Sequence, residues 1–174
     1  MFDAKNYRTI YALAFIAVAV ALIAAYREYA FRDLVSYAEA ENNALTQSIS
    51  NALWPQHGSY LKSAGDLSVD ELKAGPKHEA LHAEITRLTH DLAVLKVKIY
   101  DAEGLTVYSS DPTQIGESKA SNPAFIRTIE TSKPVSSYSH RESFSAFSHK
   151  RFNVDVVETY VPVRASDGMP DAVF

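Results

Sequence analysis

The chain opens with one long apolar segment, and everything after it is a mixed pattern of polar and apolar residues. From Thr9 to Tyr26 there are 18 uncharged residues, bracketed by Arg8 and Arg27. At 1.5 Å per residue this segment would form a helix of roughly 27 Å, close to the ~30 Å hydrocarbon thickness of a bilayer. We therefore predict a cytoplasmic tail at 1–9, a transmembrane helix at 10–26 and an extracytoplasmic domain at 27–174.

Two features of this segment leave alternatives open. Lys5 and Arg8 precede small-residue sequences such as Ala19-Val20-Ala21, a pattern that also occurs in cleaved signal peptides. The apolar run is longer than a usual signal peptide, so we expect an uncleaved anchor. Lys5 and Arg8 precede the apolar segment, and Arg27 and Arg32 follow it. The number of positive charges on the two sides therefore does not determine which end of the helix faces the cytoplasm. The short tail and the large following domain favour an N-terminus inside the cell.

Helical periodicity continues beyond the apolar segment to Leu53, and Trp54-Pro55 is predicted to end this helix because a residue before proline avoids the α region. Its apolar positions are spaced alternately by four and three residues, which is typical of a coiled-coil seam. The predicted seam of a homodimer consists of Phe31, Val35, Asn42, Leu45 and Ile49. The alternative is an amphipathic helix that packs on its own domain and leaves Asn42 in solvent.

The remaining pattern predicts short helices followed by strands. Ser68 and Glu71 form a capping-box motif, Pro76 begins a helix with an apolar face of Leu81, Ile85, Leu88 and Leu92, and Asn122-Pro123 begins another at 124–130. Strands are predicted at 95–99, 105–110, 135–141, 151–164 and 171–174, with a hairpin turn at 166–168. The predicted fold class is α+β, with a five-stranded antiparallel sheet covered on one face and flanked by helices.

Composition narrows the possible partners. The net charge is -4 and no cluster of Lys or Arg occurs, which argues against nucleic acid as a partner. There is no cysteine, so neither a disulfide framework nor a thiolate zinc site is possible. The sequence has no P-loop, no dinucleotide fingerprint and no nucleophile elbow, and we predict no cofactor and no enzymatic activity within these residues.

One short motif matches a metal-binding pattern that occurs in enzymes. His78-Glu79-Ala80-Leu81-His82 matches the H-E-x-x-H pattern of zinc proteases, in which two histidines one helical turn apart bind the metal. Pro76 places His78 in the first helical turn, and no third ligand follows at the expected offset. We interpret the motif as a solvated helix face, with a zinc enzyme or a metal sensor using His78 and His82 as the alternative.

A second group of residues suggests a ligand pocket. Residues 139–147 combine charged and aromatic side chains at the end of a predicted strand. Small-molecule sites usually place a few polar groups among apolar ones, and Arg can bind a carboxylate with two hydrogen bonds. The predicted pocket residues are Tyr108, His140, Arg141 and Tyr160. Alternatively, this segment is an ordinary strand end with Arg141 paired to a surface acid.

Several stretches resemble a known family. Residues 97–110 and Gln114-Ile115-Gly116-Glu117 resemble the first hairpin and loop of extracytoplasmic PAS-like (Cache) sensor domains. Residues 51–55, 139–141, 144–147 and 160–163 are similar to segments of bacterial membrane sensor histidine kinases and diguanylate cyclases. The resemblance implies a sensor in the bacterial inner membrane, signalling to a cytoplasmic kinase or cyclase that lies outside these residues.

The sequence therefore predicts the input region of a transmembrane receptor. In this hypothesis a small molecule binds outside the cytoplasm, and the signal passes through the membrane helix of a homodimer. The alternatives are the zinc site and a module that only anchors or dimerises without a ligand.

Overall fold

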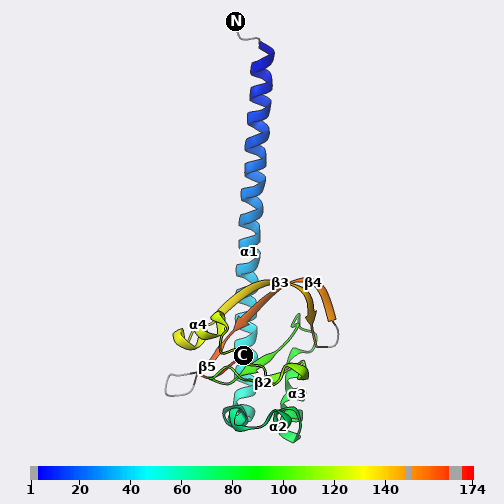
Figure 1. Cartoon of the computed structure of the whole chain (residues 1–174), viewed down its shortest axis with the longest axis vertical. Coiled ribbons are helices and arrows are strands. Elements are labelled where there is room, and N and C mark those ends of the chain that lie inside the picture. Colours follow the sequence, from blue (N-terminus) through cyan, green and yellow to red (C-terminus); the bar gives the residue numbers. More distant parts are fainter. Residues whose placement is uncertain (1–3, 148–149, 165–169) are drawn as a thin grey trace. The chain divides into compact units, whose positions relative to one another are not determined.

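The computed structural model describes residues 4–147, 150–164 and 170–174, with side chains described from residue 10 onward except at 164. The chain divides into two compact units, residues 1–38 and residues 39–174. The elements are named in Figure 1. Helices and antiparallel strands are both present, which confirms the mixed fold class.

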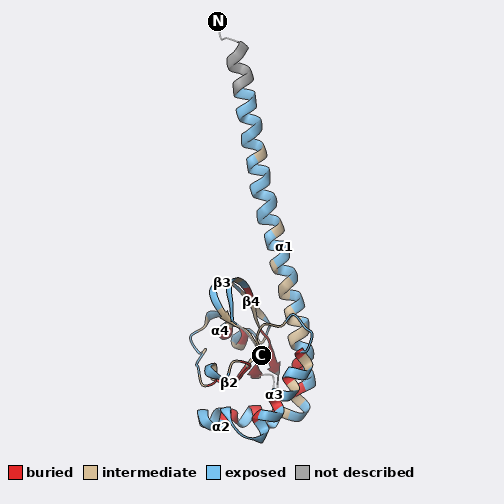
Figure 2. Cartoon of the chain, turned by 90° about the vertical axis from the view of Figure 1, so that its right-hand side faces the viewer, coloured by how far each residue is buried: buried red, intermediate tan, exposed pale blue. Residues whose placement is uncertain are grey.

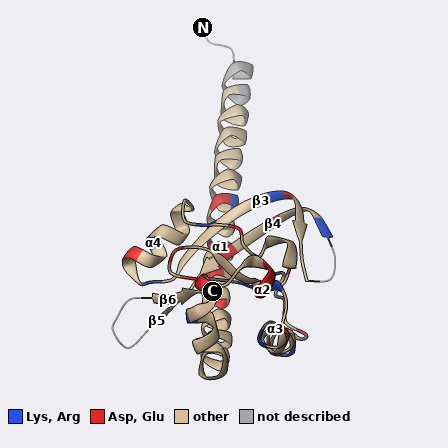
Figure 3. Cartoon of the chain, turned by 60° about the horizontal axis from the view of Figure 1, so that its bottom comes forward, with Lys and Arg blue, Asp and Glu red and all other residues tan. Residues whose placement is uncertain are grey.

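The first unit consists of the N-terminal part of helix α1, which runs without a break from Ala4 to Ser63. Most residues of this part are exposed, as the pale blue ribbon in Figure 2 shows, and among its apolar side chains Phe15 is 75% exposed. Within the described residues it is the one helix long and apolar enough to cross a membrane. Figure 3 shows that charged residues are missing from most of this stretch.

The predicted end of the helix at Trp54-Pro55 is wrong, because α1 continues through Pro55 for another two turns. Proline inside a helix removes one backbone hydrogen bond and its ring crowds the carbonyl four residues earlier. Pro55 and Asn51 are both exposed, so water can reach the carbonyl that lacks its partner. Beyond Pro55 the helix buries Tyr60 and Leu61, whose burial favours its continuation.

Short helices follow α1, with boundaries set by local capping. After η1 (Ala64–Asp66), α2 (Val69–Lys73) begins with the predicted capping box of Ser68 and Glu71. Helix α3 (Pro76–Thr89) has Pro76 in its first turn, and α4 (Pro123–Thr131) is capped by Asn122. A short η2 (Pro112–Gln114) lies between α3 and α4 in the sequence. Leu92 was predicted on the apolar face of α3, but it lies after the helix and is 43% exposed.

The strands form two antiparallel sheets, so the predicted single five-stranded sheet is wrong. The larger sheet contains β1 (Lys98–Tyr100), β2 (Thr106–Ser109), β5 (Pro162–Arg164) and β6 (Pro170–Val173) in the order β2-β1-β6-β5. The second pairs β3 (Val135–Ser145) with β4 (Lys150–Tyr160). The predicted turn at 166–168 lies outside the described residues.

The two sheets separate at residues 160 and 161, where consecutive residues of one extended segment pair with different strands. Tyr160 forms the last pair of the two-stranded sheet, opposite Val135. The next residue, Val161, instead exchanges two backbone hydrogen bonds with Phe174, at 2.8 and 3.0 Å. The predicted strand 151–164 is thus split between two sheets at this point.

Two groups of buried side chains hold the second unit together. The larger core includes Leu53 and Leu61 of α1, Leu81 and Ile85 of α3, and Ile99 of β1. The smaller one contains Tyr100, Phe125, Tyr160 and Val173. Since Ile99 and Tyr100 are adjacent in β1, their side chains point to opposite faces of the sheet. The two cores therefore lie on opposite sides of it.

The residues predicted to form a dimer seam have different environments. Ile49 is 6% exposed in the larger core, and Leu45 packs against the same core. Asn42 donates a hydrogen bond from Nδ2 to the Val157 carbonyl at 3.1 Å. These three side chains thus contact the chain's own domain. Phe31 and Val35 belong to the first unit, and the dimer seam stays a prediction.

Candidate functional site

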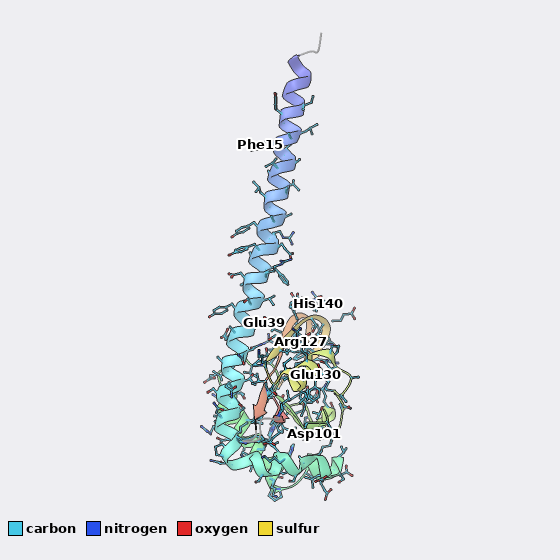
Figure 4. All side chains as sticks on the ribbon, turned by 90° about the vertical axis from the view of Figure 1, so that its left-hand side faces the viewer. Phe15, Glu39, Asp101, Arg127, Glu130 and His140 are labelled. Atoms are coloured by element: carbon cyan, nitrogen blue, oxygen red, sulfur yellow. The ribbon has the colours of Figure 1, made fainter. Side chains whose placement is uncertain are left out.

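The four predicted pocket residues occupy three separate places. Tyr108 is completely buried in the larger core, with its hydroxyl 3.0 Å from His82 Nδ1. Tyr160 lies in the smaller core. His140 is exposed on β3, where Figure 4 labels it, and its ring nitrogens contact Asp155 at 2.8 Å and Asn153 at 3.1 Å. Arg141 donates to Glu158 at 3.0 Å.

The register of β3 and β4 determines which of these residues share a face. Ser137 pairs with Glu158, and Arg141 pairs with Val154. Because directly opposed residues and every second residue project to the same face, Arg141 lies on the face that carries Glu158 and Tyr160. His140 projects to the other face. The structure therefore brings Arg141 and Tyr160 together but places Tyr108 and His140 elsewhere.

Further polar residues join Arg141 and Tyr160 on this side of the sheets. Lys98 Nζ lies 3.4 Å from Glu117, and its side chain is only 14% exposed. Tyr100 lies beside Tyr160, with ring centroids 5.9 Å apart. We call this group the charged face; it consists of Lys98, Tyr100, Glu117, Arg141, Glu158 and Tyr160.

The protonation properties of the charged face reflect burial. Burial raises the pKa of Tyr160 to about 12, and the charge of Glu158 acts in the same direction. Burial also raises the pKa of Tyr100, assisted by its neighbour Tyr160. Burial lowers the pKa of Lys98, which the nearby Glu117 partly opposes. Both tyrosines are thus neutral hydroxyl groups, able to donate and accept hydrogen bonds.

Two further residues, Phe125 and Ser139, border the charged face. Phe125 of α4 packs edge-on against Tyr100 at 5.8 Å and against Tyr160 at 6.5 Å. Ser139 is on the same face of β3, and its Oγ is buried with no hydrogen-bond partner in the described part of the chain. A buried polar atom without a partner is unfavourable, so an additional group that bonds it would be stabilising.

Sequence reasoning missed most of the charged face. Lys98 lies in the strand predicted at 95–99, where its alternation with Val97 and Ile99 is typical of any half-buried strand. Glu117 belongs to the stretch 114–117 that resembles a Cache loop, but that resemblance assigns it no role, and Glu158 belongs to no recognised motif. The only signal available was the unusual length of the alternating strand 151–164, which places Glu158 and Tyr160 two residues apart on one face.

The H-E-x-x-H residues form a different cluster, between α3 and β2. His78 is only 8% exposed, so its interpretation as part of a solvated face is wrong, whereas His82 is exposed. Their rings are parallel within 9°, with centroids 6.3 Å apart, and both lie near Tyr108. Among the described residues, no three His, Cys, Asp or Glu side chains are grouped to hold a metal.

Acid is expected to destabilise the domain through His78. Burial lowers the pKa of His78, and the nearby His82 lowers it further, against the smaller opposing effects of the Leu72 carbonyl and Glu79. The unfolded chain therefore binds a proton more readily than the folded chain. This stabilising contribution is complete above the ordinary histidine pKa of about 6.5 and is lost as the pH falls below it, by at most about 1.4 kcal/mol per pH unit for one proton.

Denaturant unfolding of the wild type and His78→Gln between pH 7.5 and 5 measures this effect. The variant should lose stability less steeply on acidification. His140 has the opposite tendency, since Asp155 raises its pKa, but it is present in both proteins and does not affect the comparison. Equal slopes for the wild type and His78→Gln would refute the prediction.

Comparison with known proteins gives little further information. No family model matches the chain, and no curated protein matches it. Among solved structures, the chain is similar to an extracellular ligand binding receptor from Desulfohalobium retbaense DSM5692, with 19% identity and a TM-score of 0.42. The similarity covers 80% of this chain and 23% of that chain. The chain thus spans about a quarter of the length of that receptor.

Proposed function

We propose that the chain is the sensor region of a bacterial membrane receptor, anchored by residues 10–26 with residues 27–174 outside the cytoplasm. The observation that supports this best is the continuity of α1, which runs from the apolar segment to Ser63. The same helix contributes Ile49, Leu53 and Leu61 to the domain core. A PAS-like (Cache) origin of the domain is part of the proposal, and it rests on the resemblance of residues 97–110 and 114–117 to such domains.

The charged face is the proposed ligand site. Lys98 and Arg141 can attract a carboxylate, while Glu117 and Glu158 can attract an ammonium group. The hydroxyl groups of Tyr100 and Tyr160 can orient the ligand, and Phe125 can cover its apolar part. Ser139 Oγ would gain a hydrogen-bond partner, which it lacks among the described residues. The favoured ligand is thus a small molecule that carries both charges.

A direct structural link leads from this site to α1. Glu158 and Tyr160 belong to β4, and the neighbouring Val157 accepts the hydrogen bond of Asn42 through its carbonyl. A ligand that moves β4 would therefore displace α1. For this movement to carry a signal, the ligand must bind the two arrangements with different affinities. We propose a homodimer whose α1 helices pass the change to a cytoplasmic histidine kinase or diguanylate cyclase.

Thermal unfolding with added small molecules tests the binding step. The full chain in detergent is screened against amino acids, carboxylates and amines, and a ligand that binds the native state should raise the apparent melting temperature. Replacing Arg141 by alanine should weaken binding about tenfold or more, because charged hydrogen bonds contribute roughly 1.5–3 kcal/mol. Arg127→Ala, on the exposed face of α4, should retain the shift.

Two results would contradict the binding proposal. One is the absence of a shift with every compound, which would favour a module that only anchors or dimerises. The other is an undiminished shift in Arg141→Ala. The transmission step is tested separately in the receptor with its effector: two glycines inserted after Arg32 should abolish the response while the melting-temperature shift remains, and a normal response would refute transmission through α1.

A further inference from the structure

A groove of about 480 Å³ lies beside α1, apart from the charged face. It lies between the helix, the connection from α4 to β3, and β5. Its lining residues are Gln47, Asn51, Trp54, Pro55, Ser132, Pro134, Pro162 and Val163. This volume is within the range of about 300–1,000 Å³ that is usual for small-molecule sites.

The described lining of the groove is uncharged. Trp54, three prolines and Val163 supply the apolar and aromatic surface, and none of the eight described lining residues is charged. Among these residues a ligand with a formal charge would lose hydration without gaining an ionic partner. The lining therefore favours a neutral ligand with a flat apolar surface.

The ring of Trp54 is held in place by the next turn of the helix. A Cβ atom at Gly58 would lie 3.1 Å from Cδ2 and Cε2 of Trp54, so any larger residue there would require the ring to move by a few tenths of an ångström. Lys62 Nζ lies 5.8 Å from the ring centroid and pairs with Asp171 at 2.6 Å. A ring fixed in this way is a rigid surface for stacking, and aromatic pairs contribute roughly 0.5–1.5 kcal/mol beyond the buried area.

The side-chain amides of Gln47 and Asn51 determine which polar groups a ligand in the groove needs. Gln47 Nε2 donates to Asn51 Oδ1 at 3.1 Å, which fixes both side chains one helical turn apart. This bond leaves Gln47 Oε1 as an acceptor and Asn51 Nδ2 as a donor. A ligand that bonds to both needs one N–H group and one C=O group, and a lactam or a pyrimidine base carries both.

We propose that this groove binds a small, neutral, planar heterocycle with a lactam edge, stacked on Trp54 and hydrogen-bonded to Gln47 and Asn51. This site is separate from the charged face and does not depend on the ligand proposed there. Because Gln47, Asn51 and Trp54 all belong to α1, its occupancy would act directly on the helix.

Trp54 is the only tryptophan in the chain, so its fluorescence reports on the groove directly. The full chain in detergent is titrated with uracil, with excitation at the red edge of the indole absorption to avoid absorption by the base. We expect a saturable change in emission. The matched probe is 1,3-dimethyluracil, which keeps the ring but has no N–H group, and it should bind about three- to tenfold more weakly.

Variants test the same contacts independently. Gln47→Leu and Asn51→Leu should each weaken uracil binding about three- to tenfold, because each removes one hydrogen bond at an exposed position. Gln56→Leu, on an exposed part of α1 outside the groove, should bind as the wild type, and so should Arg141→Ala on the charged face. The proposal is overturned if uracil gives no saturable change, if dimethyluracil binds equally well, or if both groove variants retain full affinity.

Discussion

Replacing Leu53 by alanine is expected to lower the free energy of unfolding of the domain by about 2–5 kcal/mol. Leu53 has no exposed surface and lies in the larger core, where α1 packs with α3 and the first hairpin. The substitution removes buried methyl groups and leaves a cavity that the surrounding side chains fill only in part. Chemical denaturation of the full chain in detergent, followed by circular dichroism, measures the change.

Leu92→Ala is the matched control, because it deletes the same atoms at a site that is 43% exposed and outside α3. It should change the free energy of unfolding by about 1 kcal/mol or less. If Leu53→Ala were as mild as Leu92→Ala, the C-terminal part of α1 would not be a core element of the domain, and transmission through α1 would lose its structural basis.

Replacing Pro55 by alanine should stabilise the chain, by roughly 1–3 kcal/mol. The variant supplies the N–H group that the Asn51 carbonyl lacks and removes the crowding of the proline ring. Pro55 is exposed, so little buried surface is lost. Because Pro55 also lines the groove, the same variant should bind uracil less tightly.

Pro76→Ala is the control for this prediction. Pro76 is in the first turn of α3, where the N–H group has no helical partner and proline is well tolerated. Its replacement should change stability by about 0.5 kcal/mol or less. A loss of stability in Pro55→Ala, compared with this control, would show that the ring makes favourable contacts that outweigh the missing hydrogen bond.

The sequence by itself predicted the features that depend on neighbouring residues. The capping box of Ser68 and Glu71, the Asn122 cap of α4 and the antiparallel pairing of β1 with β2 are all present. Each pairs groups that lie close together in the sequence, so a local pattern can indicate it without knowledge of the distant segments. The length and polarity of residues 9–26 likewise required nothing beyond the local sequence.

Tertiary packing determined the features on which the proposed functions depend. Helix α1 continues past Pro55 because the burial of residues beyond the proline compensates for one missing hydrogen bond. Asn42 and Ile49 pack against the chain's own domain, although their spacing also suits a coiled coil.

The composition of both candidate sites was also decided by tertiary structure. Arg141 and Tyr160 come together with Lys98, from a strand more than 40 positions earlier, only because of sheet pairing and the packing of α4. Trp54 and Pro162 meet in the groove for the same kind of reason. Sequence periodicity reveals which face of an element is apolar, but the partner of that face is selected by the combined packing of distant segments.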